Sequence, residues 1–185
     1  MSNYRRNTTE GATWFFTVVS FHRRPFLCDE PVRRALRESI CRVRQKYPFK
    51  IDAWVLLPDH SHFIWTLPEG DSNYSLRIRL LKRFVTQSCK SRLHQDRLNT
   101  ASRSEKGESS LWQRRFWEHQ IRDEKDFGIH MDYIHYNPVK HGLCKSPGEW
   151  RYSTLHRLVR KGKYPEKWAS SFEPEIPQKL EFGEA

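Results

Sequence analysis

The spacing of apolar residues in the first part of the chain predicts a strand and then a helix. Thr13–Phe21 is rich in β-branched and aromatic side chains, a composition typical of a strand. From Pro31 to Tyr47, apolar residues recur every three or four positions with Arg or Glu between them, as on an amphipathic helix. Pro48 has no backbone N–H and is expected to end this helix.

Two further strand-like segments follow with a short turn between them. Ile51–Leu57 and His60–Leu67 both have strand composition, and the intervening Pro58-Asp59 favours a turn. We therefore expect these two segments to pair as a hairpin.

The second half of the chain predicts a helix, a polar segment, a short strand and another helix. Ser75 is the expected cap of the first of these helices. Residues 94–110 have no apolar periodicity and predict a mobile surface loop. Phe116–Ile121 is the fourth strand candidate, and Asp123–His135 is the next helix, which Asn137-Pro138 is expected to stop.

The order of these elements predicts one fold class. Strand, helix, strand, strand, helix, strand is the α+β, ferredoxin-like split βαβ arrangement with an antiparallel sheet, here followed by an additional C-terminal helix. A chain of 185 residues is typical of a single domain. We assign residues 1–172 to this domain and residues 173–185 to a tail.

Charge narrows the class of partner. Lys and Arg number 33 against 22 Asp and Glu, a formal net charge of +11, which favours a polyanion such as nucleic acid. The tail differs, because its four glutamates and one lysine give it a net charge of −3. We expect this acidic tail to fold over a basic groove and compete with DNA. An ordinary basic enzyme is the alternative reading of the charge.

Cysteine spacing and hydropathy exclude several other classes. The four cysteines lie far apart without a Cys-x-x-Cys pair, which argues against a zinc knuckle or a disulfide framework. No apolar run approaches the length of a membrane span, and no apolar segment follows the basic start as in a signal peptide. We expect a cytoplasmic, nucleoid-associated protein without a membrane partner.

Candidate chemistry begins with two histidines on one predicted strand. His60 and His62 flank Ser61, so a period of two places both imidazoles on the same face of the strand. Two neighbouring neutral imidazoles can bind a divalent cation and leave open positions for substrate. Two unrelated surface histidines are the alternative.

The late helix offers a tyrosine and an amide on one face. Tyr133 and Asn137 are four residues apart and therefore stack on the same side of a helix, with His130 one turn earlier. Met131 and Ile134 belong to a different, apolar stripe, so the Tyr133 hydroxyl could reach a cleft. The alternative is a core tyrosine whose hydroxyl meets a backbone carbonyl.

Three ordered motif blocks carry a resemblance to a known family. His60-Ser61-His62 within residues 54–71, Trp112–His119 and Asp132–Gly142 resemble the motifs of the REP-associated tyrosine transposases, where REP denotes repetitive extragenic palindromes. The resemblance runs in register from about residue 2 to about residue 168. One departure is Ser61, since this position is usually bulky and hydrophobic; looser packing beneath the strand is expected. The polar stretch before Trp112 also looks longer than in the family.

The resemblance implies an HUH endonuclease and strand transferase acting on single-stranded DNA. It implies that His60 and His62 bind a divalent metal, that Tyr133 is the nucleophile, and that Asn137 stands where relatives place a third metal ligand. The implied substrates are REP hairpins flanked by a short tetranucleotide. Attack by Tyr133 would leave a 5′-phosphotyrosine and a free 3′ hydroxyl. The metal would be Mg²⁺ or Mn²⁺, and imidazole ligands suggest that Mn²⁺ supports activity at least as well.

Basic and aromatic residues supply candidate contacts to DNA. Their structural alternatives are a solvated helix face for the charges and a core position for the aromatics, and we expect the core for Phe116. The candidates are Arg5, Arg6, Lys82, Arg83, Trp112, Arg114, Arg115 and Trp117.

Two other functions remain open at this point. One is a non-catalytic single-stranded nucleic-acid-binding module of ferredoxin-like fold. The other is a hydrolase using a metal-bound water, for which the sequence offers few acidic ligands, with Asp59 the nearest to the histidines. The sequence also leaves open whether the chain acts as a monomer or a homodimer.

Overall fold

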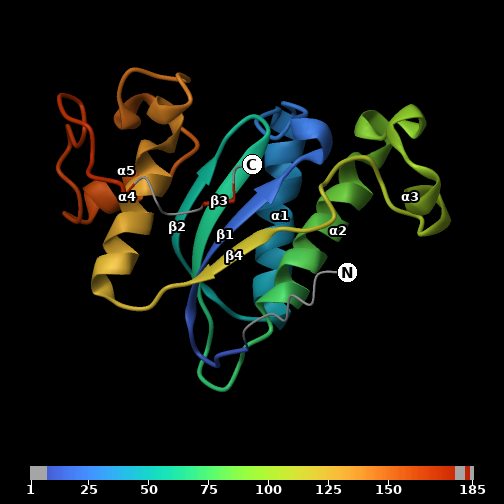
Figure 1. Ribbon diagram of the computed structural model, residues 1–185, viewed down its shortest axis with the longest axis horizontal. Coiled ribbons are helices and arrows are strands. Elements are labelled where there is room, and N and C mark those ends of the chain that lie inside the picture. The colour runs from blue at the N-terminus through green and yellow to red at the C-terminus, as the bar shows by residue number, and fades with distance from the viewer. Residues whose placement is uncertain (1–7, 178–181, 184–185) are drawn as a thin grey trace.

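The computed structural model describes residues 8–177 and 182–183, and its centre is a four-stranded sheet in the order β2-β3-β1-β4 (Figure 1). Each neighbouring pair of strands is antiparallel. This order is that of a ferredoxin-like split βαβ sheet, so the predicted fold class is confirmed. The strands are β1 (Thr13–Val19), β2 (Lys50–Leu56), β3 (His60–Thr66) and β4 (Trp117–Gln120).

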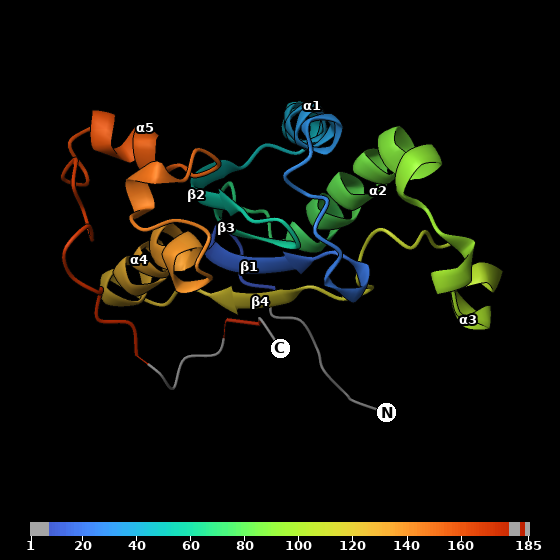
Figure 2. The ribbon, with the colours of Figure 1, turned by 90° about the horizontal axis from the view of Figure 1, so that it is seen from above.

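Helices cover both faces of the sheet (Figure 2). The helices α1 (Glu30–Lys46) and α2 (Tyr74–Leu93) pack on one face, and α4 (Glu124–Lys140) packs on the other. Within the described residues, no helix has both the length and the apolar character that crossing a bilayer would require. The shorter elements are α3 (Ala101–Glu105), α5 (Leu155–Arg160) and 3₁₀ turns at Phe21–Arg23, Asp96–Leu98 and Pro147–Glu149.

Strand β1 shows how the two faces divide the core. Trp14, Phe16 and Val18 pack with side chains of α1 and α2. Phe15 points to the other face and packs with residues of α4. Because side chains alternate along a strand, Thr17 lies on this second face as well. Polar groups of β1 and β3 on the α4 side are therefore buried beneath a helix.

Two predicted helix ends differ from the structure. Helix α2 begins at Tyr74 rather than after Ser75, because the Asn73 side chain accepts a hydrogen bond from the Leu76 amide at 3.0 Å and caps the first turn. Helix α4 continues through Pro138 to Lys140. Pro138 lies in the last turn, where a missing N–H costs one hydrogen bond, and the His141 amide still bonds to the Asn137 carbonyl at 3.0 Å.

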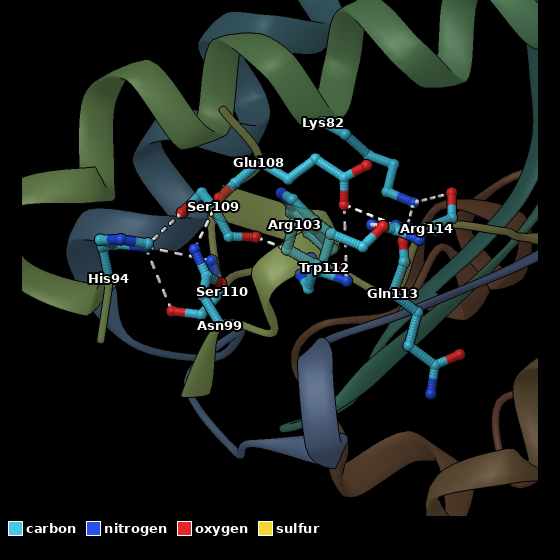
Figure 3. Close-up of polar contacts among 11 residues, drawn as sticks. Lys82, His94, Asn99, Arg103, Glu108, Ser109, Ser110, Trp112, Gln113 and Arg114 are labelled. Atoms are coloured by element: carbon cyan, nitrogen blue, oxygen red, sulfur yellow. Dashed lines mark hydrogen bonds and ion pairs between the residues drawn. The ribbon is translucent and has the colours of Figure 1, made fainter. Parts of the chain in front are cut away.

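The polar segment 94–110 is also more regular than expected. It contains a 3₁₀ turn and α3, and Arg103 anchors it to the chain that follows. The Arg103 guanidinium is buried over the Phe21 ring and donates hydrogen bonds to the Ser109 and Trp112 carbonyls at 2.8 and 2.9 Å. His94 contacts the Ser110 hydroxyl from the start of the segment (Figure 3). These bonds form a small lobe beside α2.

Candidate active site

His60 and His62 lie side by side on the face of the sheet that α4 covers. They are paired across β3 and β1 with Val19 and Thr17. Their ring centroids are 4.9 Å apart, and the two residues are 1% and 0% exposed. The structure thus brings the two imidazoles together as the strand period predicts.

Each imidazole is oriented through its Nδ1 atom. His60 Nδ1 lies 2.7 Å from Asp59 Oδ1, and His62 Nδ1 lies 2.9 Å from the Thr17 hydroxyl. Metal-binding histidines are typically held in this way by a partner on the other ring nitrogen. Any metal ligation therefore falls to the Nε2 atoms, and the donor set fits a divalent cation.

Asp59 supplies a fixed negative charge next to His60. Burial raises the pKa of its carboxyl, but hydrogen bonds from His60 and Arg23 outweigh burial and lower the pKa to about 2. The Arg23 guanidinium reaches Asp59 Oδ2 at 2.7 Å. The carboxylate is ionised at neutral pH and fixes the His60 ring.

Tyr133 lies on α4 directly against the histidine pair. Its ring centroid is 5.3 Å from that of His62, and the residue is 1% exposed. The Tyr133 ring packs beside Phe15 in the core on this face of the sheet, as expected for a core tyrosine. It also lies next to the His62 imidazole. Asn137 is buried one turn later on the same helix.

Two residues of this site were not predicted from the sequence. Lys140 Nζ lies 3.3 Å from the Tyr133 hydroxyl and 4.8 Å from the centre of its ring. The His141 ring is 5.0 Å from that of His60. Lys140 follows Tyr133 by seven residues, about two helical turns, so the spacing would have revealed it had the helix been extended past Pro138.

Comparison with known proteins identifies the family. Residues 11–137 match the family described as "Transposase IS200 like", a span that includes both histidines, Tyr133 and Asn137. The chain is 46% identical to the REP-associated tyrosine transposase of Escherichia coli (strain K12), over 91% of this chain and 92% of that protein. The chain belongs to the REP-associated tyrosine transposases, within the IS200-like family.

Two further similarities agree with this family. A protein of Haemophilus influenzae, also named as a REP-associated tyrosine transposase, is 43% identical over 92% of this chain and 95% of its own length. A solved structure of a REP-associated tyrosine transposase bound to a REP hairpin has a TM-score of 0.78 and 42% identity. That match covers 98% of this chain and 99% of the other.

The predicted DNA contacts of this REP-associated tyrosine transposase fall into three groups. Some line a groove of about 650 Å³ between α2 and residues 103–116, where Lys82 Nζ bonds to the Gln113 carbonyl at 2.5 Å (Figure 3). The residues that line this groove are Lys82, Arg83, Trp112 and Arg114. Arg115 and Trp117 lie outside the groove, and Arg5 and Arg6 lie outside the described residues.

The aromatic members of this set are less accessible than the prediction requires. Trp112 is 6% exposed and packs in the core with α1 and α2, so it offers little ring surface to a base. Trp117 is half-buried and packs edge-on against Phe15 at 5.8 Å. Phe116 packs against the same core as Trp112, as expected. Apolar packing, rather than stacking on bases, accounts for most of this aromatic surface.

Ser61 does not loosen the packing beneath the histidine strand of this transposase. Its hydroxyl accepts a hydrogen bond from Trp54 Nε1 at 2.8 Å and donates one to the Val55 carbonyl at 2.7 Å. The residue is 3% exposed. A polar side chain with two hydrogen bonds therefore fills this position, and the expected loosening is absent.

Within the described part of the C-terminal tail, Phe182 lies at the candidate active site. Phe182 stacks on Tyr133 with ring centroids 3.5 Å apart and an interplanar angle of 8°. The Phe182 carbonyl accepts a hydrogen bond from the Thr17 hydroxyl, the same group that contacts His62. This segment covers the tyrosine and one histidine partner.

A second cluster of metal-ligand side chains lies near the first. His119 of β4 and Asp126 and His130 of α4 bring one ligand atom each within 4.8 Å of the others. The two imidazoles stack at 4.6 Å and 12°, however, and lone pairs in stacked rings lie in separate planes rather than pointing at one ion. Asp126 Oδ2 accepts hydrogen bonds from His119 at 2.9 Å and from Arg122. The cluster therefore works as a carboxylate clamp between β4 and α4.

Proposed function

We propose that this transposase is a metal-dependent HUH endonuclease and strand transferase that cleaves and rejoins single-stranded DNA at REP-like hairpins. The reaction passes through a 5′-phosphotyrosine on Tyr133. The single observation that supports it most is the contact of the Tyr133 ring with the His60–His62 pair, 5.3 Å from the His62 ring. The binding of a REP hairpin by the solved relative supports the choice of substrate.

The chemistry is an exchange of one phosphodiester for another. The Tyr133 oxygen bonds to the phosphorus, the bond to the 3′ oxygen breaks, and the strand leaves with a free 3′ hydroxyl. The reverse attack by a 3′ hydroxyl rejoins DNA and releases the tyrosine, so no nucleotide cofactor is needed. The phenol loses its proton on attack and regains one when the strand is rejoined.

Lys140 helps Tyr133 to act as a nucleophile. A phenol with an ordinary pKa near 10 is mostly protonated at neutral pH. The Lys140 ammonium, 3.3 Å from the hydroxyl, stabilises the phenolate by charge and by donating a hydrogen bond. Lys140 is thus a catalytic residue beside the nucleophile.

The histidines and Asn137 hold the metal in this proposal. A divalent cation on His60 Nε2, His62 Nε2 and the Asn137 side chain would neutralise a non-bridging phosphate oxygen. Imidazole ligands suit Mn²⁺ better than Mg²⁺, which prefers oxygen. Asp59 and Thr17 position the two imidazoles through their Nδ1 atoms.

One chain supplies the nucleophile and the metal ligands, which favours a monomer with its active site in cis. The basic groove beside α2 takes phosphates of the hairpin through Lys82, Arg83 and Arg114. The tail opposes this activity, since Tyr133 is 1% exposed with Phe182 stacked on its ring, and the hydroxyl must be uncovered before a phosphate can reach it. We place the reaction at the nucleoid in the cytoplasm.

The proposal is tested with a labelled single-stranded REP-like hairpin, Mn²⁺ and the Tyr133→Phe variant. The full chain should nick the hairpin and form a denaturation-resistant adduct. Tyr133→Phe should do neither and should bind the hairpin within a few-fold of the unmodified protein. Nicking by Tyr133→Phe with release of a 5′ phosphate would instead indicate a hydrolase using metal-bound water. Binding without nicking, even after removal of the tail, would indicate a non-catalytic module.

A further inference from the structure

A second pocket lies at the free edge of the sheet, away from both the histidines and the basic groove. It has a volume of about 830 Å³ and is bounded by β2, α4 and the chain from α5 to Trp168. Strand β2 is the outer strand on this side of the sheet (Figure 1). None of the candidate catalytic residues lines this pocket, so the proposed reaction does not account for it.

The rim of the pocket is positively charged. Five cationic side chains line it against two carboxylates, Asp52 and Asp132. Lys50 Nζ lies 2.6 Å from Asp52 Oδ1, which offsets one of these charges. The five cations are Arg44, Lys50, Arg157, Lys161 and Lys163.

Two of these lysines form no ion pair with a carboxylate of the described residues. Lys161 and Lys163 are exposed on the turn after α5. Across residues 8–177, neither of them forms an ion pair with a carboxylate. Arg157, by contrast, is held inward by the Ile51 and Asp52 carbonyls at 3.0 and 2.9 Å. The two lysines are therefore placed to bind an anion at the mouth.

Beneath this rim the pocket is apolar and aromatic. Phe127 and Met131 of α4 line one side, and Tyr164 and Trp168 line the other. The Tyr164 and Trp168 rings meet edge-on at 4.8 Å, and the Tyr164 hydroxyl is fixed by Asp132 at 2.7 Å. A free inorganic anion would use the lysines but not this floor. Paired DNA would keep its bases inside the duplex. An unpaired nucleotide uses both, with its phosphate on the rim and its base against the half-buried Phe127 and Tyr164 rings, since Met131 and Trp168 are each only 8% exposed.

We infer that the β2-edge pocket binds an unpaired nucleotide of single-stranded DNA adjoining the hairpin. The inference rests on the proposed function, because it gives the same DNA a second contact. Met131 and Asp132 directly precede Tyr133 on α4, so one helix has the pocket on one side and the nucleophile on the other. A strand held in the pocket would therefore be anchored close to the phosphate that Tyr133 attacks.

The test compares two hairpin probes and two charge-reversal variants. One fluorescent hairpin has single-stranded extensions at both ends and the other is blunt, and binding is measured by anisotropy with the metal chelated. Lys161→Glu/Lys163→Glu removes the lysines at the pocket mouth. Lys90→Glu/Lys145→Glu changes the total charge equally at exposed lysines outside both the pocket and the groove.

The pocket variant should bind the extended hairpin about tenfold more weakly than the unmodified chain and the blunt hairpin within about twofold. Its salt slope on the extended hairpin should fall by about 1.4, as for two lost phosphate contacts on a single strand. An unchanged affinity for the extended hairpin would overturn the inference, as would an equal loss on both probes or an equal loss in the control variant. Unchanged far-UV circular dichroism and melting temperature show that the variants are folded.

Failure of the proposed function gives a different result. If no adduct forms on Tyr133 but the two probes still differ, the proposed reaction is wrong and the inferred nucleotide binding in the pocket stands. If the adduct forms but the two probes do not differ, the proposed reaction stands and the inferred nucleotide binding in the pocket is wrong.

Discussion

The ring of Phe182 lies parallel to the ring of Tyr133, with centroids 3.5 Å apart. A residue of the tail thus covers one face of the tyrosine ring, and Tyr133 as a whole is 1% exposed. The Thr17 hydroxyl bonds the Phe182 carbonyl and also contacts His62. The tail therefore touches both the proposed nucleophile and a residue that contacts His62, a proposed metal ligand.

Removing the Phe182 ring should speed adduct formation. Phe182→Ala loses the stacking that holds the covered state, so the open state is more populated and the initial rate with Mn²⁺ should rise about tenfold. Phe172→Ala is the matched control, because Phe172 is 55% exposed and lies outside the site. Equal rates for Phe182→Ala and the unmodified protein would mean that the tail does not limit access.

Replacing Lys140 should slow cleavage and shift its pH dependence. Lys140→Ala should reduce the rate at neutral pH by about 10- to 100-fold, because the phenolate loses a neighbouring cation. The rise of rate with pH should move to higher pH, and Lys140→Arg should restore part of the activity. Lys125→Ala, on the exposed first turn of the same helix, is the control. A slower rate with an unmoved pH profile would assign Lys140 a structural role only.

Weakening the support of His60 should weaken metal binding. Asp59→Asn removes the charge that orients the ring, and the Mn²⁺ concentration for half-maximal cleavage should rise about 10- to 100-fold. Asp96→Asn is a matched control. Asp96 also pairs with a histidine, His94, with 2.9 Å between Oδ1 and Nε2, but this pair lies outside the candidate active site. The same Mn²⁺ dependence in Asp59→Asn and the unmodified chain would argue against His60 as a ligand.

Acid should destabilise the fold through His135. Burial lowers the pKa of this imidazole to about 3, so between pH 6.5 and 3 the unfolded chain binds a proton that the folded chain does not. Stability therefore falls as the pH falls, and this residue alone should cost about 2 kcal/mol between pH 7 and pH 5. Urea unfolding of His135→Gln at both pH values should show a smaller loss than the unmodified protein. His22→Asn, at an exposed histidine, is the control. An equal loss of unfolding free energy between pH 7 and pH 5 in the unmodified protein, His135→Gln and His22→Asn would show that His135 is not the source of the acid sensitivity.

The sequence predicted those features that depend on local period. Alternation along β3 placed His60 and His62 on one face, and the order of strands and helices indicated the ferredoxin-like sheet. Pro138 misled the prediction of α4, because its cost is small in a last turn whose residues are packed against the sheet. The same error hid Lys140, which shares a helix face with Tyr133 only if the helix continues.

Features that depend on long-range packing could not be predicted in this way. Trp112 lies in a polar, basic stretch that favours DNA contact, but the fold buries it in the core that α1 and α2 help to form. Phe182 follows a Pro- and Glu-rich segment, and nothing in its neighbourhood indicates contact with a residue 49 positions earlier (182 − 133). The edge pocket likewise joins side chains of β2, α4 and the chain beyond α5. Such contacts appear only once the sheet and helices have assembled.

The most direct test of the account is to locate the covalent bond. The full chain and the Phe182→Ala variant are incubated with a single-stranded REP-like hairpin and Mn²⁺, digested with nuclease and protease, and analysed by tandem mass spectrometry. A nucleotide joined through a 5′ phosphate to the peptide containing Tyr133, and absent without Mn²⁺, is the predicted result. Cleaved DNA with no modified peptide, or a modification on another tyrosine, would contradict it.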